Sequence, residues 1–354
     1  MPGSRVTSID VARRAGVSQS AVSRAFTPGA SVGAATRNKV LKAASELGYE
    51  PNALARGLIT GRSRIIGLVL SQLDNLFYPE VLDQLARRLQ GDGYHLLMFV
   101  GEGADADDLV GKLLQYRVDG IILAAVTLSS ALAQRCSEAG IPVVLFNRIM
   151  AARSGGPAVG SVRGDNMRGG RLIAQHLAGL GHRRIAFIAG REDSSTNLER
   201  ERGFLRGLRL MGVPLMVRAQ GDYDPARAAE AARTLCADPR MRPDAIFVAS
   251  DQMAIAVMDT LRSSLGLSIP EDVSIVGFDN VPQASWAAYQ LTTFEQPVTA
   301  MVDAAATLLL GQLERGALAP RNLIIPGELH VRASTARRLC KRRTAGQPAT
   351  RGVS

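Results

Sequence analysis

From residue 64 onward, short apolar runs alternate with segments of helical periodicity, and this alternation limits the fold more than any other feature of the sequence. The expected strands are residues 65–70, 94–100, 120–124, 142–146, 159–162, 184–188, 245–249 and 273–277. The expected helices are residues 78–90, 105–116, 130–139, 167–180, 197–211, 226–237 and 251–265. Continuous apolar strands separated by helices predict an α/β fold with parallel sheets covered on both faces. Because there are too many of these strand and helix units for one small sheet, we expect two lobes with a ligand in the cleft between them.

The first fifty residues lack this alternation, and their pattern predicts an all-α domain. Val11 and Ala12 fall on one face of a short helix, and Gly16 then supplies a position where a left-handed backbone is free of strain. Ser18 follows as the N-cap of a second helix, whose Val22 faces back to the first. Two short helices around a glycine turn make a helix-turn-helix. A third helix is expected over residues 36–47, ending at Gly48, with these residues buried: Val40, Leu41, Ala44 and Leu47.

Polar side chains face outward from the second helix, as a helix lying in a DNA major groove requires. The candidates for reading base edges are Gln19, Ser20 and Arg24, and Arg24 is best suited to guanine. Contacts to DNA phosphates are expected from Thr7, Ser18, Ser23 and Thr36. The alternative is a three-helix bundle that binds nothing, because helix-glycine-helix is only a moderate signal by itself.

The pattern continues beyond these helices and carries a resemblance. Thr7 to Arg24 is followed by Thr36-Arg37 and by Gly48-Tyr49-x-Pro51-Asn52-x-x-Ala55-Arg56-x-Leu58. The pattern resembles the LacI/GalR family of bacterial transcription regulators, and matching motifs recur along nearly the whole chain, among them Asn75-x-Phe77-Tyr78-Pro79 and Gly277-Phe278-Asp279. The resemblance implies a helix-turn-helix head followed by a two-lobed body similar to a type I periplasmic sugar-binding protein.

The same resemblance implies the domain boundaries. They are a DNA-binding domain at 1–51, a hinge helix or linker at 52–62, an effector-binding and dimerisation domain at 63–336, and a basic tail at 337–354. The N-lobe would be about 63–163 plus 293–321, and the C-lobe about 164–292 plus 322–336. In the hinge, the resemblance assigns Asn52, Ala55 and Leu58 to DNA contact, with Leu58 as an apolar wedge in the minor groove. The alternative is a flexible linker. Both interpretations hold if the segment is a linker in the free protein and becomes a helix when the protein binds DNA.

The net charge of +10 is concentrated at the two ends of the chain. Residues 1–60 hold eight Lys and Arg against three acidic residues, and residues 337–354 hold six against none. The residues between them are close to neutral. A basic head on a neutral body is typical of a DNA-binding protein. For the tail we favour a solvated end over specific DNA contact.

Candidate effector-binding side chains follow several of the expected strands, where the carboxyl ends of parallel strands meet. A polyol ligand needs hydrogen-bonding groups of both senses and an apolar face to stack on. The candidates are Phe77, Tyr78, Asn147, Arg200, Tyr223, Ser250 and Asp279. In the resembling family, the residues that match Arg200 and Asp279 anchor the effector, and the one that matches Tyr223 stacks on it in several members.

Two of these positions depart from the family pattern, and three have a simpler explanation. Asn147 stands where some sugar-binding relatives have Asp, and Ser250 where many have Asn, which favours a ligand other than a simple hexoside. Alternatively, Phe77 and Tyr78 are core residues, and Arg200 pairs on the surface with one of its neighbours, Glu199 or Glu201.

Enzyme signatures are largely absent, since the sequence has no P-loop, no His-x-x-x-His motif and no Gly-x-Ser-x-Gly nucleophile elbow. Cys136, Cys236 and Cys340 are widely spaced, which indicates reduced thiols in the cytoplasm and no metal site. We expect no signal peptide, no cofactor, and no apolar run of the roughly 20 residues that cross a membrane.

These observations together predict a transcriptional regulator, and the family is composed mostly of repressors. It would bind a palindromic operator as a homodimer, under the control of a small molecule, a sugar or sugar derivative, in the cleft between the lobes. Whether that molecule acts as inducer or corepressor stays open. Two alternatives from other classes are a free-standing small-molecule binding protein of transport and a metabolic α/β enzyme with an accessory head.

Overall fold

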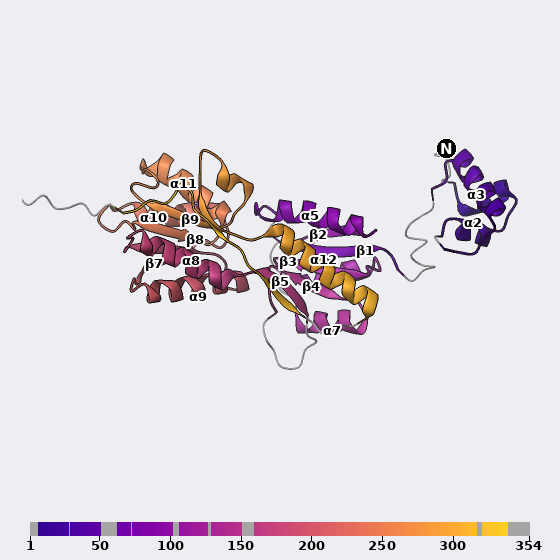
Figure 1. Ribbon diagram of the computed structural model, residues 1–354, viewed down its shortest axis with the longest axis horizontal. Helices are drawn as coiled ribbons and strands as arrows, with labels where there is room; N and C mark the ends of the chain where they lie inside the picture. The colour runs from indigo at the N-terminus through magenta and orange to yellow at the C-terminus, as the bar shows by residue number, and fades with distance from the viewer. Residues whose placement is uncertain are drawn as a thin grey trace, which may run out of the picture. The chain divides into compact units, whose positions relative to one another are not determined.

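The computed structural model describes residues 6–27, 29–50, 62–71, 73–101, 106–126, 129–150, 159–316 and 321–338. Its contacts divide the chain into two compact units, Met1–Arg64 and Ile65–Ser354. The first unit is a small helical domain, and the second contains two α/β lobes (Figure 1). Several residues named in the sequence analysis lie outside the described residues. They are Asn52, Ala55 and Leu58 of the hinge, Cys340, and the basic tail beyond residue 338.

The head consists of three helices, α1 (Ser8–Ala15), α2 (Gln19–Ala25) and α3 (Ala34–Leu47). Both Thr7 N and Thr7 Oγ1 donate to the Asp10 carboxylate at the start of α1, at 3.0 and 2.6 Å. Gly16 ends α1 with a φ of 65°, and Ser18 Oγ accepts from Ala21 N at 3.3 Å to start α2. The predicted helix-turn-helix geometry is confirmed.

The core of the head is formed by one side of each helix, centred on Val11, Val22 and Val40. The prediction that Leu41 is buried is wrong, because Leu41 is 44% exposed. Ala43 takes that place, since Val40, Ala43, Ala44 and Leu47 follow the three- and four-residue spacing of one helix face, and Leu41 lies outside it.

The N-lobe is a parallel six-stranded sheet in the order β11-β5-β4-β3-β1-β2. Its strands are β1 (Ile65–Leu70), β2 (His95–Val100), β3 (Gly120–Ala124), β4 (Val143–Phe146), β5 (Gly160–Gly164) and β11 (Asn322–Ile325). Helices α5 (Tyr78–Gly91) and α12 (Val298–Arg315) contribute to the apolar core on one face. Helices α6 (Ala106–Leu114) and α7 (Ser130–Glu138) contribute to a separate core on the other. The predicted coverage of both faces is confirmed.

The C-lobe repeats this architecture in the order β12-β10-β9-β8-β6-β7, with only the β10–β12 pair antiparallel. Its strands are β6 (Ile185–Ala189), β7 (Leu215–Gln220), β8 (Ala245–Val248), β9 (Ser274–Asp279), β10 (Thr292–Glu295) and β12 (Leu329–His330). Its helices are α8 (Asn166–Gly179), α9 (Ser195–Leu210), α10 (Pro225–Cys236), α11 (Asp251–Leu265) and the short η1 (Pro282–Ser285). Helices α8 and α9 pack against each other, as do α10 and α11 (Figure 1).

Two predicted lobe boundaries need correction. Residues 293–321 were assigned to the N-lobe, but β10 continues the C-lobe sheet, pairing in parallel with β9. Residues 322–336 were assigned to the C-lobe, but β11 pairs with β5 in the N-lobe sheet. Phe294 of β10 is fully buried and packs 5.1 Å from Phe278 of β9, ring centre to ring centre. The chain therefore crosses between the lobes only after each of these strands has completed its sheet pairing.

Three glycines allow α8 and α9 to approach closely. An added Cβ on Gly170 of α8 would overlap the carbonyl oxygen of Arg200 on α9, and one on Gly203 would overlap the carbonyl oxygen of Met167. A Cβ on Gly207 would lie 2.8 Å from the carbonyl oxygen of Arg171. Since these are backbone atoms, no rotamer change relieves the overlap. The glycines thus fix the position of the α9 backbone at Arg200, one of the predicted effector residues.

Candidate functional site

The outer surface of α2 carries the predicted DNA-reading residues. Gln19, Ser20 and Arg24 are exposed, and Ser23 is partly buried. Gln19 Nε2 donates to Ser8 Oγ at 3.0 Å, and the hydroxyls of Ser18 and Ser20 lie 2.9 Å apart. Thr7 is exposed at the start of α1, and Thr36 is partly buried in the first turn of α3. The head therefore presents a polar surface on its second helix, as the sequence predicted.

A second site lies in the body, where residues from both lobes line a small cavity of about 10 Å³. It is lined by Asn75, Phe77, Tyr78, Asn147, Arg148, Thr196, Arg200, Tyr223, Asp279 and Gln296. Six of the seven predicted effector residues are in this lining. The volume is below the range of roughly 300–1,000 Å³ that is usual for small-molecule pockets. The structure thus shows a closed cleft that would have to open to admit a ligand.

Arg200 lines this cavity and is 2% exposed. Its Nε donates to Asn166 Oδ1 at 3.0 Å, its Nη1 donates to the Ala249 carbonyl at 2.5 Å, and its Nη2 lies 3.2 Å from Asp279 Oδ1. The guanidinium carbon also lies 3.8 Å from the centre of the Phe278 ring, a cation–π contact.

The surface alternative for Arg200 does not hold, because its acidic neighbours bind elsewhere. Glu199 pairs with Arg163 at 3.1 Å, and Glu201 pairs with Arg218 at 2.7 Å.

Asp279 has a second buried carboxylate behind it. Burial raises the pKa of Asp279 to about 6, against the lowering effect of Arg200. Burial, together with the charge of Asp279, raises the pKa of Asp251 to about 7. The Asp251 carboxylate accepts from Thr293 Oγ1 at 2.6 Å and from Val281 N at 2.9 Å, which makes it a structural residue of the C-lobe.

Aromatic rings supply the apolar part of the cavity. Phe77 and Tyr78 are 3% and 2% exposed and pack edge to face, with ring centres 5.1 Å apart. Burial raises the pKa of the Tyr78 hydroxyl, so the phenol stays neutral. Tyr223, from the C-lobe, has a hydroxyl 3.3 Å from Thr196 Oγ1. The core and site interpretations of Phe77 and Tyr78 are therefore compatible, since both residues are buried and line the cavity.

Ser250 is the predicted effector residue that the structure does not bring to the cavity. It is buried at the start of α11, where its Oγ accepts from Met253 N at 3.4 Å. A serine side chain is short, and here its oxygen serves as the N-cap of the helix. We therefore remove Ser250 from the candidate site.

Four lining residues were missed in the sequence: Asn75, Arg148, Thr196 and Gln296. Asn75 belongs to a motif that was recognised, and Arg148 directly follows a predicted site residue. Gln296 comes directly after β10, a strand that was not predicted, and its Nε2 donates to Asp279 Oδ1 at 2.6 Å. Thr196 had no signal in the sequence, because its position depends on how the two lobes meet.

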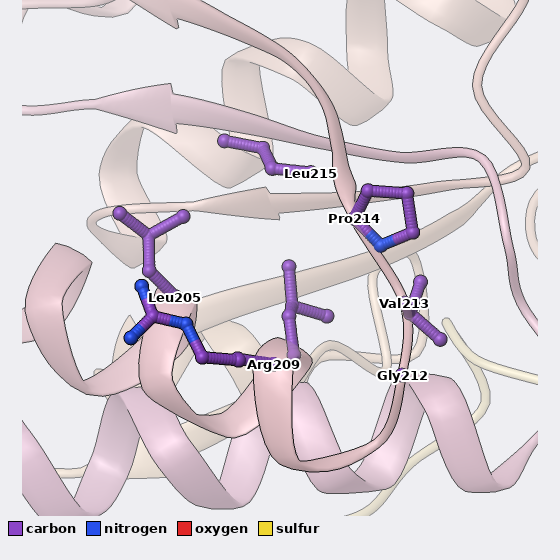
Figure 2. A pocket seen from close by; sticks show the side chains of 7 residues that line it. Leu205, Arg209, Gly212, Val213, Pro214 and Leu215 are labelled. Atoms are coloured by element: carbon purple, nitrogen blue, oxygen red, sulfur yellow. The ribbon is translucent and has the colours of Figure 1, made fainter.

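A larger hollow lies at the far end of α9 and has a different character. Its volume is about 380 Å³, and it is lined by Leu205, Leu208, Arg209, Gly212, Val213, Pro214 and Leu215 (Figure 2). Arg209 is the one charged side chain among these. Since a specific small-molecule site needs several converging polar groups, we place the effector site in the smaller cavity.

Comparisons with known proteins cover both the head and the body. Residues 8–52 match the family model described as bacterial regulatory proteins, lacI family, and residues 174–335 match a periplasmic binding protein-like domain. The HTH-type transcriptional regulator CelR of Thermobifida fusca is 34% identical over 332 residues, covering 92% of this chain and 96% of CelR. The chain belongs to the LacI family of bacterial regulatory proteins.

Solved structures of LacI-family proteins extend this similarity to the whole fold. The lac repressor dimer bound to operator and the anti-inducer ONPF is 29% identical and has a TM-score of 0.82, covering 94% of this chain and all of that one. The complex of the transcriptional regulator CelR with cellobiose is 32% identical and has a TM-score of 0.68, covering 93% and 100%. This LacI-family chain is accordingly a DNA-binding transcriptional regulator with a periplasmic-binding-protein-like body.

The described part of the chain contains no cluster of three His, Cys, Asp or Glu side chains placed to hold a metal ion. None of its described helices is both long and apolar enough to cross a membrane.

Proposed function

We propose that this regulator is a homodimeric repressor of a palindromic operator, and that a small sugar or sugar derivative bound between the lobes controls its affinity for DNA. The observation that carries the proposal is the cavity at the lobe interface, where charged, polar and aromatic side chains from both lobes converge. The lac repressor structure, which contains both an operator and an anti-inducer, supports it by family likeness. The complex of CelR with cellobiose supports a carbohydrate ligand in the same way.

Hydrogen bonds between the lobes provide the link from ligand to DNA. Leu76 N, in the N-lobe, donates to Gln252 Oε1 of α11 at 3.0 Å. Arg148 Nη1 donates to Thr196 Oγ1 at 3.1 Å, and Ile149 N donates to Ser195 Oγ at 3.3 Å. A ligand that binds the open and closed arrangements with different affinity shifts their populations. The N-lobe is joined to the head through residues 52–62, so a change in lobe angle moves the two heads of a dimer relative to each other.

In this proposal each half of the operator receives one α2 helix. Gln19, Ser20 and Arg24 read base edges, and phosphate contacts by Thr7, Ser18, Ser23 and Thr36 set the register. Asn52, Ala55 and Leu58 contact the centre of the operator.

In this proposal the protein is not an enzyme. It acts in the cytoplasm, where a bacterial operator is located. Its curated relative CelR is named a transcriptional regulator, and such regulators are not enzymes. The alternative of a free-standing transport protein is not favoured, because the chain carries a complete helix-turn-helix head.

Arg24→Ala tests the DNA-reading surface. We expect the variant to lose about 1–3 kcal/mol of binding to an operator selected from random DNA, with relaxed preference at one base pair per half-site. Arg13→Ala is the matched control, because Arg13 is an equally charged, exposed residue of the head that lies on α1. The measurement is binding-site selection by the wild type, followed by fluorescence anisotropy of both variants on operator and random DNA. Equal losses on both DNAs, or equal losses for both variants, would contradict the base-reading role.

A further inference from the structure

Arg148 is a second buried cation of the effector cavity, and it forms no ion pair with any residue that the structure describes. It follows β4 in the N-lobe and is 7% exposed. Its Nη1 donates to the Asn147 carbonyl at 2.8 Å and to Thr196 Oγ1 at 3.1 Å, both neutral acceptors. Its Nε and Nη2 have no partner among the residues that the structure describes. Most of the donor capacity of this guanidinium is therefore available to a bound molecule.

The other charges of the cavity wall balance each other. Arg200 is paired with Asp279, so the lining as a whole has a net charge of +1, which is that of Arg148. Asp193 is near enough for Arg148 to lower its pKa slightly, but that carboxylate is exposed and pairs with Arg191 at 2.8 Å. Burying a cation without a counter-charge is unfavourable, and an anionic ligand group would remove this penalty.

Two hydrogen-bond acceptors in the same wall also lack partners. Asn147 Oδ1 and Gln296 Oε1 are buried without a hydrogen bond, on residues that are 4% and 3% exposed. The orientation of the Gln296 amide is set by its Nε2, which donates to Asp279. A buried acceptor without a partner needs a hydrogen-bond donor, and the hydroxyl groups of a ligand can supply it. The aromatic rings of Phe77, Tyr78 and Tyr223 offer surface for the C–H face of such a molecule.

We propose that the effector is an anionic polyhydroxylated metabolite, a sugar acid or a sugar phosphate, whose oxyanion binds the free donors of Arg148 while its hydroxyls donate to Asn147 and Gln296. The planar fork of an arginine matches a carboxylate or a phosphate with two parallel hydrogen bonds. This inference rests on the proposed function and narrows the class of its ligand. It sets the chain apart from CelR, whose solved complex contains the neutral sugar cellobiose.

The test is isothermal titration calorimetry of the full-length protein with matched sets of sugars: glucose, gluconate and glucose 6-phosphate; galactose and galacturonate; ribose and ribose 5-phosphate; cellobiose and cellobionate. We expect an anionic member of one set to bind about 10- to 100-fold more tightly than its neutral partner, as hydrogen bonds to charged groups predict. The carboxylate and phosphate members distinguish the two sources of the oxyanion.

Three variants assign the effect to this residue. Arg148→Met should lose most of the preference for the anion, and Arg148→Lys should retain part of it, because the charge remains without the fork. Arg87→Met is the control, since it removes one exposed positive charge from the same lobe. Thermal melting without ligand checks that each variant is folded. If Arg148→Met does not fold, the lysine variant and the matched sugar sets still test whether the cavity prefers an anion.

The outcomes separate this inference from the proposed function. Tighter binding by a neutral sugar, no binding by any anionic member, or unchanged affinity in Arg148→Met would overturn the anion inference. A neutral sugar that binds and alters operator affinity would overturn it while leaving the proposed function intact. An anion that binds through Arg148 without altering operator affinity would support the inference and count against the proposed function.

Discussion

Arg200→Met is expected to lower the free energy of unfolding of the C-lobe by about 3–5 kcal/mol, because it leaves the Asp279 carboxylate buried without its partner. It also removes hydrogen bonds to Asn166 and to the Ala249 carbonyl. Arg200 lowers the pKa of Asp279, so its loss raises that pKa further. When the pKa of a carboxyl group is raised in the folded state, the free energy of unfolding of the protein falls as the pH rises through that pKa. The variant should therefore be least stable relative to wild type at alkaline pH.

The measurement is urea unfolding at pH 5 and pH 8, followed through the fluorescence of Trp286. This is the single tryptophan of the chain and lies in the C-lobe, directly after η1. Asp279→Asn combined with Arg200→Met removes both charges, and we expect the pair to be destabilised by less than the sum of the two single changes. Additive effects would show that the ion pair does not couple the two residues. A destabilisation below about 1 kcal/mol would show that Arg200 is not buried against Asp279 as described.

Gly170→Ala is expected to destabilise the C-lobe by about 3 kcal/mol, at the upper end of overpacking effects, because its methyl group would overlap backbone of α9 at Arg200 and lie 2.8 Å from Phe204 N. The helices can only separate, and this displaces Arg200 from Asp279. We expect weaker ligand binding in addition to the lower stability, measured by urea unfolding and calorimetry.

Gly179→Ala is the matched control on the same helix. A Cβ at Gly179 meets nothing within 4 Å, and alanine is the better helix former by roughly 0.5–1 kcal/mol. The control should therefore be neutral or slightly stabilising and should bind ligand normally. Equal behaviour of the two variants would mean that the contact between α8 and α9 does not position Arg200.

Much of this architecture follows from local pattern. The strands and helices expected from the alternation are all present, each beginning and ending within two residues of its prediction. Helix α12 was missed although it is 18 residues long, and so was the short η1; the strands that were missed have weak local signals. β7 is an edge strand that is only partly buried along its whole length, and β12 has two residues. β10 and β11 are short, and which sheet each one joins depends on contacts distant in sequence, so the lobe boundaries were displaced by a few residues.

The candidate site was predictable where it depends on one strand end. Asp279 ends β9, and Asn147 directly follows β4, so sequence position was enough to select them. Thr196 and Gln296 required knowledge of how segments meet across the sheet or across the lobes. The roles of side chains were harder still. Ser250 had the right position and chemistry, but its hydroxyl caps α11.

In the proposed function, a ligand in the lobe cavity controls the affinity of the head for DNA. The direct measurement is the anisotropy of labelled operator, titrated with full-length protein at increasing concentrations of a ligand shown by calorimetry to bind the cavity. We predict a change in operator Kd of about 5- to 150-fold that saturates with the Kd of the ligand, weaker binding identifying an inducer and tighter binding a corepressor. A ligand that saturates the cavity and leaves the operator Kd unchanged would contradict the account.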